Sequence, residues 1–295
     1  MKILITGITG FLGGRLGRYW SDLGHVVTGT GRRVEARGLE GFRVFAFSLG
    51  DRIDGAQLVG QDVVIHCAYD SRASVEVNVA GTKNVCMAAE EAGASWQVFV
   101  GSYAARPQSV AIYGRLKYEL ESFFLERGHT VVRPGLVVGD GGMFQRNMDS
   151  IVRAPVIPLL DGGRDAIPIV AIGDFVRAMD VLLNQRRSGV FNLFNRDLVP
   201  MRTFVDTVAR IAGRKPLRVA VPLKLALLLV TAATKLGITL PFGTDNIRSL
   251  KQSRPGLYES DLLALIPAAL SFEEMVESAF QARLQSRYRT PPVSR

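Results

Sequence analysis

Short apolar runs alternate with patterns of helical period through the first half of the chain. We predict strands at residues 3–6, 25–30, 43–47, 63–67, 97–101 and 130–132, with helices between most of them, clearest at 11–23, 74–92 and 110–126. Valine and isoleucine fill the runs almost without interruption, which is typical of parallel strands that helices cover on both faces. The pattern therefore predicts an α/β domain of βαβ units over residues 1–135.

The alternation of strands and helices becomes less regular after Gly135. Glycine and proline become frequent, and helical stretches outnumber strands: we expect strands at 167–170 and 190–193 and helices at 174–184, 202–212 and 272–284. We interpret residues 136–285 mainly as a smaller C-terminal substrate-binding subdomain, with segments near 165–195 returning to the first domain. Residues 286–295 carry no periodic apolar pattern and are expected to form a disordered tail.

Composition and charge narrow the class of protein. The chain has 295 residues, of which 47% are hydrophobic, and a formal net charge of +9. Its arginines are spread without a basic run, so we expect a solvated basic surface and no nucleic-acid partner. The longest apolar stretch, 223–233, is much shorter than the ~20 residues of a membrane-spanning helix, so we expect no integral membrane segment. A helix that covers the substrate is the favoured interpretation, and contact with a membrane surface stays open.

Two cysteines, Cys67 and Cys86, fall in an apolar strand and in a helical pattern. This favours buried thiols in a reducing compartment over a disulfide. The first strand begins directly after Met1, which leaves no room for a signal sequence. We therefore expect a cytoplasmic protein, and we predict no metal site.

A glycine-rich segment, Thr6-Gly7-Ile8-Thr9-Gly10-Phe11-Leu12-Gly13, joins the first strand to the first helix. Glycines at positions 7, 10 and 13 let the backbone turn tightly and approach a pyrophosphate at the helix N-terminus. Alone, such a segment is weak evidence, because it can be merely a tight connection.

Tyr113 and Lys117 lie one helical turn apart in the third helical pattern. Because positions i and i+4 share a face, the Lys117 ammonium can lie near the Tyr113 phenol and lower its pKa from the ordinary value of about 10. Such a phenol can exchange a proton with a substrate hydroxyl or carbonyl near neutral pH. Taken alone, Tyr113 and Lys117 are better explained as an ordinary pair on a helix surface. A serine that follows a strand, such as Ser102, is likewise often only a turn residue. Their order along the chain favours nicotinamide chemistry.

These segments resemble the short-chain dehydrogenase/reductase superfamily, and specifically its extended branch, the NAD-dependent epimerase/dehydratase-like family. Further segments extend the resemblance over most of residues 1–215. They are His66-Cys67-Ala68, Asn78-Val79-Ala80-Gly81-Thr82-Lys83-Asn84, Ser102, Arg133-Pro134-Gly135-Leu136-Val137-Val138-Gly139 and Ile172-Gly173-Asp174. The resemblance implies a Rossmann-type doubly wound parallel sheet with helices on both faces.

The resemblance also implies roles for the matching residues. Tyr113 is the expected catalytic acid or base, Lys117 lowers its pKa and holds the nicotinamide ribose, and Ser102 hydrogen-bonds the reacting oxygen. The expected cofactor-binding residues are Gly7, Thr9, Gly10, Phe11, Leu12, Gly13, Cys67, Ala68, Asn78, Gly101, Tyr113, Lys117, Arg133, Pro134 and Gly135. Expected substrate contacts are Ser102, Tyr103, Asn147 and Arg164, although ordinary loop polarity explains the last two equally well.

The end of the second strand bears on the choice of cofactor. NAD-binding folds commonly place an acid there for the adenosine ribose 2′-hydroxyl, whereas a 2′-phosphate needs arginine. The chain reads Thr28-Gly29-Thr30-Gly31-Arg32-Arg33, with no acid. We therefore predict NADP(H) over NAD, bound by Arg32 and Arg33, against the alternative of two arginines in an exposed loop.

Three functions stay open. The first is an NADP(H)-dependent reductase, or the reverse dehydrogenase, of a ketone or secondary alcohol, with a keto-sugar nucleotide among the candidate substrates. The second is a nucleotide-sugar epimerase, which oxidises its substrate transiently, and the third is a non-catalytic dinucleotide sensor. Tyr103 and Ala104 follow Ser102 in place of the acidic pair of sugar-nucleotide dehydratases, which disfavours 4,6-dehydration.

The resemblance further implies a homodimer through the helices that contain Asn84 and Tyr113. Four apolar residues of these helices are compatible with such an interface and equally with an intramolecular core. They are Val85, Met87, Leu116 and Leu120.

Overall fold

A seven-stranded parallel sheet forms the centre of the computed structural model, which describes residues 1–32, 34, 41–235 and 257–289. The strand order is β11-β6-β5-β4-β1-β2-β3. The strands are β1 (Lys2–Thr6), β2 (Val26–Gly31), β3 (Arg43–Ala46), β4 (Val63–His66), β5 (Gln97–Val100), β6 (Thr130–Pro134) and β11 (Gly189–Leu193). The order reverses at β1, because β2 and β3 lie on one side of it and β4 to β6 on the other. This is the doubly wound sheet that the sequence predicts.

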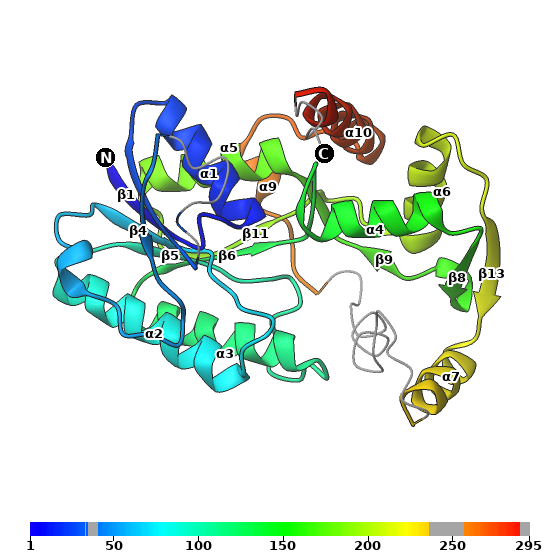
Figure 1. Ribbon diagram of the computed structural model, residues 1–295, viewed down its shortest axis with the longest axis horizontal. Coiled ribbons are helices and arrows are strands. Elements are labelled where there is room, and N and C mark those ends of the chain that lie inside the picture. Colours follow the sequence, from blue (N-terminus) through cyan, green and yellow to red (C-terminus); the bar gives the residue numbers. More distant parts are fainter. Residues whose placement is uncertain (33, 35–40, 236–256, 290–295) are drawn as a thin grey trace, which may run out of the picture.

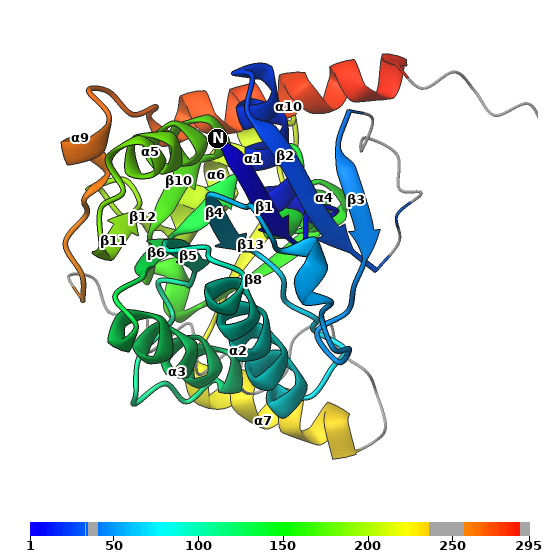
Figure 2. The same ribbon diagram turned by 90° about the vertical axis from the view of Figure 1, so that its left-hand side faces the viewer.

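Helices cover both faces of this sheet (Figures 1 and 2). One face carries α1 (Phe11–Asp22), α5 (Ile172–Gln185) and the short α9 (Leu262–Leu265), and the other carries α2 (Val75–Glu91) and α3 (Ile112–Glu126). Alternate strand residues serve the two layers: Ile3 and Ile5 join the buried cluster of α1 and α5, whereas Leu4 joins the cluster of α2. Since both faces are buried, most residues of the central strands are apolar, and the polar exceptions such as His66 and Gln97 are themselves buried.

The predicted elements of residues 1–135 are all present, and their ends differ from the expected ones by at most two residues. Strong apolar runs with glycine at the helix ends locate such elements well. The described part of this region also contains one element that the sequence did not predict, the short 3₁₀ helix η1 (Gly55–Gln57).

The remaining elements pack together beside the central sheet, mainly at the right of Figure 1. They are β7 (Leu136–Val138), α4 (Gly142–Arg153), β8 (Val156–Leu160), η2 (Asp161–Gly163), β9 (Ala166–Ile167), β10 (Ile169–Ala171), β12 (Val199–Pro200), α6 (Met201–Ile211), β13 (Leu217–Val221), α7 (Leu223–Lys235) and α10 (Phe272–Arg289). Three two-stranded pairs, β10–β7, β12–β9 and β13–β8, accompany the helices. Phe144, Phe204 and Val276 are fully buried in the core between α4, α6 and α10.

The second half departs further from the sequence expectations. The expected strand at 167–170 is two strands, β9 and β10, because Pro168 between them has no N–H, while its carbonyl accepts from the Leu136 N–H at 2.8 Å. The expected strand at 190–193 is β11, which returns to the central sheet beside β6. Helix α10 continues to Arg289 and so includes the first four residues of the expected tail, whereas residues 290–295 lie outside the described part. Among the described helices, none combines the length and apolar character needed to cross a bilayer.

Candidate active site

The loop after β1 packs closely against the segment that follows β4. Gly7 has a positive φ of 70°, and a Cβ at this position would lie 2.9 Å from the Ala68 Cα, so no other residue fits without a backbone shift. The Ala68 N–H donates to Thr6 Oγ1 at 3.2 Å, and the Gly10 N–H donates to the Gly7 carbonyl at 2.9 Å. Gly10 precedes α1 without a side-chain cap, so the first N–H groups of this helix are directed towards the loop, where an anion can be bound.

Neighbours of these glycines hold the loop in place. The Phe11 ring packs against the glycine run Gly139, Gly141 and Gly142, where any Cβ would overlap the ring. Arg15, one turn further along α1, pairs with Asp140 in the same run. Phe11 thus fixes the start of α4 against the glycine-rich loop, a contact that the resemblance does not predict.

The other residues of the expected dinucleotide loop are placed around it. Thr9 lies against the Gly31 backbone at the end of β2, Leu12 is partly buried in the main core, and Gly13 is buried within α1. Cys67 lies between β4 and Ala68, and burial raises the pKa of its thiol to about 12. The thiol is therefore protonated at neutral pH, although Cys67 is only partly buried.

Asn78 organises the loop between β4 and α2. Its side-chain oxygen accepts from the Asp70 N–H at 2.8 Å, and its amide nitrogen donates to the carbonyls of Asp70 and Ser74, each at 2.9 Å. All three contacts are to backbone, so Asn78 shapes the loop that lies beside the glycine-rich segment.

Ser102, Tyr113 and Lys117 meet where β5 ends and α3 begins. Ser102 lies close enough to the Tyr113 phenol to lower its pKa. The Lys117 ammonium donates to the Val100 carbonyl at 2.8 Å, and its Nζ lies 5.9 Å from the centre of the Tyr113 ring. The three predicted catalytic residues are therefore brought together by the packing of α3 on β5.

The ionisation of these groups differs from the sequence expectation. Loss of hydration raises the pKa of Tyr113 to about 12, although 37% of the residue is exposed, and the nearby Ser102 opposes this shift only in part. Lys117 is 5% exposed, and burial lowers its pKa to about 8. The expected lowering of the Tyr113 pKa by Lys117 is thus wrong for this structure, because the ammonium donates to a carbonyl and the phenol is desolvated.

Glu121 adds a buried carboxylate that sequence reasoning missed. It is 1% exposed, and its Oε2 lies 2.7 Å from Arg133 Nη2 on β6. Burial raises the pKa of Glu121, while Arg133 acts in the opposite direction. The Arg133 guanidinium also lies 4.3 Å from the centre of the Tyr258 ring, whose hydroxyl donates to the Ala105 carbonyl at 2.6 Å. The spacing of Glu121 four residues after Lys117 is the signal that could have identified it.

The segment after β6 also packs closely. The Gly135 N–H donates to the Leu193 carbonyl at 3.1 Å, and the Pro134 carbonyl accepts from the Tyr103 N–H at 3.1 Å. This segment therefore joins the ends of β6, β11 and β5. Its expected contact with a cofactor stays a prediction.

Tyr69 is a second aromatic residue beside Tyr113 that the sequence did not indicate. The two rings meet edge to face with centres 5.2 Å apart, and Tyr69 is itself 43% exposed. Lys117 Nζ lies 5.8 Å from the centre of the Tyr69 ring. The loop after β4 thus supplies an exposed aromatic wall next to the predicted catalytic phenol.

Arg32 is engaged in an ion pair. Its Nη1 lies 2.6 Å from Asp70 Oδ2, in the loop after β4. Arg33, the second expected phosphate ligand, lies outside the described residues.

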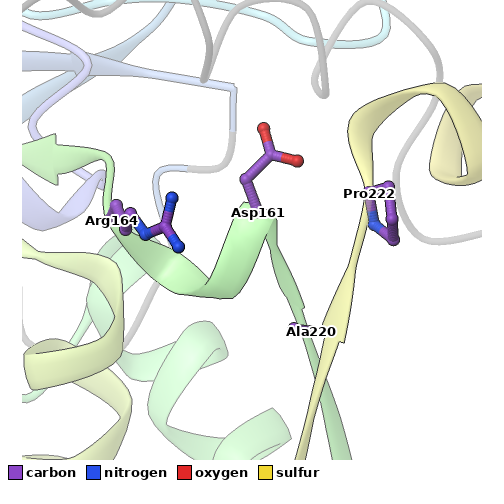
Figure 3. Close-up of a pocket in the computed structure, with 4 residues that line it drawn as sticks. All are labelled: Asp161, Arg164, Ala220 and Pro222. Carbon is purple, nitrogen blue, oxygen red and sulfur yellow. The ribbon is translucent and has the colours of Figure 1, made fainter.

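The expected substrate contacts are not gathered in one place. Tyr103 is buried, with its ring edge to face against Phe194 and Tyr258. Asn147 is exposed on α4. Arg164 lines a pocket of about 400 Å³ with Asp161, Ala220 and Pro222 (Figure 3), and no other predicted site residue lines it. Substrate roles for these residues stay predictions.

One group of possible metal ligands occurs in the described part of the chain. Atoms of Cys86, Glu90 and His129 lie within 4.8 Å of one another. Both Glu90 oxygens accept hydrogen bonds from Arg127, and His129 Nε2 lies 2.9 Å from Glu90 Oε1. An arginine already neutralises this carboxylate, which argues against a cation there.

Residues 3–195 match the model of the NAD dependent epimerase/dehydratase family. The chain belongs to this family, part of the extended short-chain dehydrogenase/reductases.

Solved structures resemble the chain over nearly its whole length. The protein gox2253 is 21% identical with a TM-score of 0.78, covering 98% of this chain and 99% of that one. The UDP-glucose 4-epimerase of Thermotoga maritima, solved with UDP-glucose, is 16% identical with a TM-score of 0.74, covering 98% and 100%. MoeE5 in complex with UDP-glucose and NAD is 18% identical with a TM-score of 0.72, covering 97% and 100%. The comparison with curated proteins gives no significant match. At these identities the likeness establishes the fold.

Proposed function

We propose that this chain is an NADP(H)-dependent reductase, or the reverse dehydrogenase, of a ketone or secondary alcohol, with a keto-sugar nucleotide among the candidate substrates. The observation that carries the proposal is the proximity of Ser102 and Tyr113 beside the buried Lys117. Two hydroxyls that meet at one point can both bind a single substrate oxygen. Family membership supports the same class of chemistry.

The residues present fit a dinucleotide. The glycine-rich loop leaves its backbone uncovered at the uncapped N-terminus of α1, which suits a pyrophosphate. Arg32 at the end of β2, where no acid is present, supports NADP(H). When bound, the nicotinamide group donates or accepts the hydride.

Tyr113 and Ser102 would act on the reacting oxygen. A carbonyl that is being reduced gains negative charge on oxygen, and two hydroxyl donors stabilise that charge as it forms. A pKa of about 12 keeps Tyr113 protonated at neutral pH, so the phenol can donate a hydrogen bond to the reacting oxygen. In this structure the Lys117 ammonium donates to the Val100 carbonyl, so the role proposed for it is to hold the nicotinamide ribose.

A nucleotide-sugar epimerase is the second candidate. The T. maritima epimerase and MoeE5, both solved with UDP-glucose, share the fold, and the same residues could oxidise an alcohol transiently. Arg32 argues mildly against it, because such enzymes usually retain NAD. A non-catalytic sensor ranks below both, since Tyr113 and Lys117 are present.

The test is to incubate the purified protein with NADPH or NADH and a panel of ketones, UDP-sugars and dTDP-sugars. Net NADPH consumption, followed at 340 nm, is the expected result for the reductase. Isomerisation without net change of cofactor would favour the epimerase instead.

Tyr113→Phe should lower kcat by about 10²- to 10⁴-fold, because the substituted ring cannot donate a proton. Tyr118→Phe, on the same helix, is the matched control and should keep wild-type activity. Equal activity of Tyr113→Phe and wild type would contradict the assigned role, and equal inactivity on every substrate would favour the sensor.

A further inference from the structure

The ion pair of Arg32 and Asp70 spans the loop that follows β1. Arg32 comes directly after β2, and Asp70 comes four residues after β4. In the sheet, β1 lies between these two strands. The 2.6 Å contact therefore joins the two sides of the crevice at the carboxyl edge of the strands.

The glycine-rich loop contacts both sides of the same crevice. On the β2 side, the Ile8 N–H donates to the Thr30 carbonyl at 3.0 Å. On the β4 side, Thr6 Oγ1 accepts from the Ala68 N–H at 3.2 Å. The ion pair thus lies beside the loop that would bind the dinucleotide.

Asp70 is the fixed partner of the pair. Asn78 holds the Asp70 backbone through two hydrogen bonds, and Asp70 Oδ1 accepts from the Arg72 N–H at 3.0 Å. The Asp70 side chain is 18% exposed, whereas that of Arg32 is 59% exposed. The Asp70 carboxylate is thus held in place next to the more exposed guanidinium.

We propose that Asp70 determines how strongly this chain distinguishes NADP from NAD. The acid that is missing from the end of β2 is supplied across the crevice by Asp70, which restrains Arg32 and repels a 2′-phosphate. A 2′-phosphate has to displace Asp70 from Arg32 or share the guanidinium with it, so the natural preference for NADP is small. This inference rests on the proposed binding of a dinucleotide.

The test measures nucleotide binding by calorimetry, independently of turnover. The probes are 2′,5′-ADP and 5′-AMP, which differ in the 2′-phosphate and lack nicotinamide, together with NADP⁺ and NAD⁺. Asp70→Asn removes the charge and keeps an oxygen that can accept from Arg72. We expect it to raise the affinity ratio of 2′,5′-ADP to 5′-AMP about tenfold over wild type, because the freed guanidinium can bind the phosphate with both nitrogens.

Three further variants sharpen the test. Asp62→Asn changes the net charge equally, but Asp62 accepts from the Lys2 N–H at the opposite edge of the sheet, so the ratio should stay at the wild-type value. Asp70→Ser, a second removal of the charge, should raise the ratio as Asp70→Asn does. When Arg32 is already replaced by glutamine, Asp70→Asn should change the affinity ratio of 2′,5′-ADP to 5′-AMP less than about threefold. The reason is that no arginine is then present for the Asp70 substitution to release.

An unchanged or lowered ratio in both Asp70 variants, with nucleotides still bound, would overturn this inference and leave the proposed function intact. Failure of folded wild-type protein to bind any of the four nucleotides would overturn the proposed function, and this inference with it.

Discussion

At the scale of single residues, burial dominates the ionisation of the candidate site. Lys117 loses part of its affinity for protons on entering the interior, and Tyr113 gains some. These shifts leave a neutral phenol next to an ammonium that titrates near pH 8. At neutral pH, Tyr113 is therefore protonated and can donate a hydrogen bond to a substrate oxygen.

Lys117 should make stability depend on pH. Its pKa falls from 10.5 in the unfolded chain to about 8 in the folded one. Between these pH values, unfolding therefore takes up a proton. Below pH 8, burial of the charged ammonium lowers the unfolding free energy by its full amount, and this destabilisation decreases as the pH rises towards 10.5. Relative to Lys117→Met, wild type should gain about 1–2 kcal/mol of unfolding free energy between pH 7 and pH 9.5.

Chemical denaturation at several pH values measures this difference. Lys224→Met, which changes an exposed lysine on α7, is the control and should show no comparable trend. A relative stability that falls for wild type as pH rises would show the assigned direction of the shift to be wrong.

At the scale of elements, three successive turns of α3 hold the end of β5. Tyr113 lies next to Ser102, Lys117 donates to the Val100 carbonyl, and the Glu121 carboxylate packs against Gly101. The i, i+4, i+8 spacing on one helix face thus matches three consecutive residues at the end of a strand. The site is built by the docking of one element on another, so its geometry depends on how closely they approach.

Gly101→Ala should disturb this docking. A Cβ at Gly101 would lie 2.4 Å from Glu121 Oε1, whose carboxylate is held by Arg133 and cannot easily move. We expect a loss of about 1–3 kcal/mol in unfolding free energy and a reduced kcat, because Ser102 is the next residue.

Gly173→Ala is the matched control, since a Cβ there meets no atom within 4 Å and the residue lies in α5. It should stabilise the protein by about 0.5–1 kcal/mol. Thermal melting of both variants measures the contrast, and equal effects of the two substitutions would argue against close docking at Gly101.

At the scale of the whole molecule, the predicted homodimer loses part of its sequence support. Val85, Leu116 and Leu120 are buried in the protein's own core, and Met87 alone of the four is exposed. Lys83 of α2 pairs with Glu119 of α3 at 2.7 Å, so the outer face of these helices is partly charged. A groove of about 890 Å³ runs along α2 beside Met87 and Asn84.

We still expect a dimer through α2 and α3, as the family resemblance implies. Light scattering after size exclusion should then give twice the chain mass of 32.2 kDa. Met87→Glu should shift the mass towards one chain, because a carboxylate buried in the interface lacks a partner. Arg153→Glu, in the last turn of α4, is a control that should leave the mass unchanged. A monomeric mass for wild type would end the dimer proposal.

Local patterns were enough to predict the elements of the first domain. Continuous apolar runs such as 63–66 and amphipathic stretches such as 11–22 determine their own secondary structure within one or two residues. The two-residue strand β12 and the separation of β9 from β10 could not be predicted in this way. They exist because distant segments meet, as Val199 pairs with Ile167, and no local pattern encodes such pairing.

By itself, then, the sequence determined the α/β order of the elements, the glycine-rich loop and the spacing of Tyr113 and Lys117, because periodicity and spacing are local properties of the chain. The doubly wound sheet and the place of Ser102 beside these two residues followed from the resemblance to the family. Only the tertiary structure decided what surrounds these groups. The direction of the Tyr113 shift, the Glu121–Arg133 ion pair and the hold of Asp70 on Arg32 all arise from segments that are far apart in the chain. Desolvation and charge pairing depend on distances in space, which spacing along the chain does not determine.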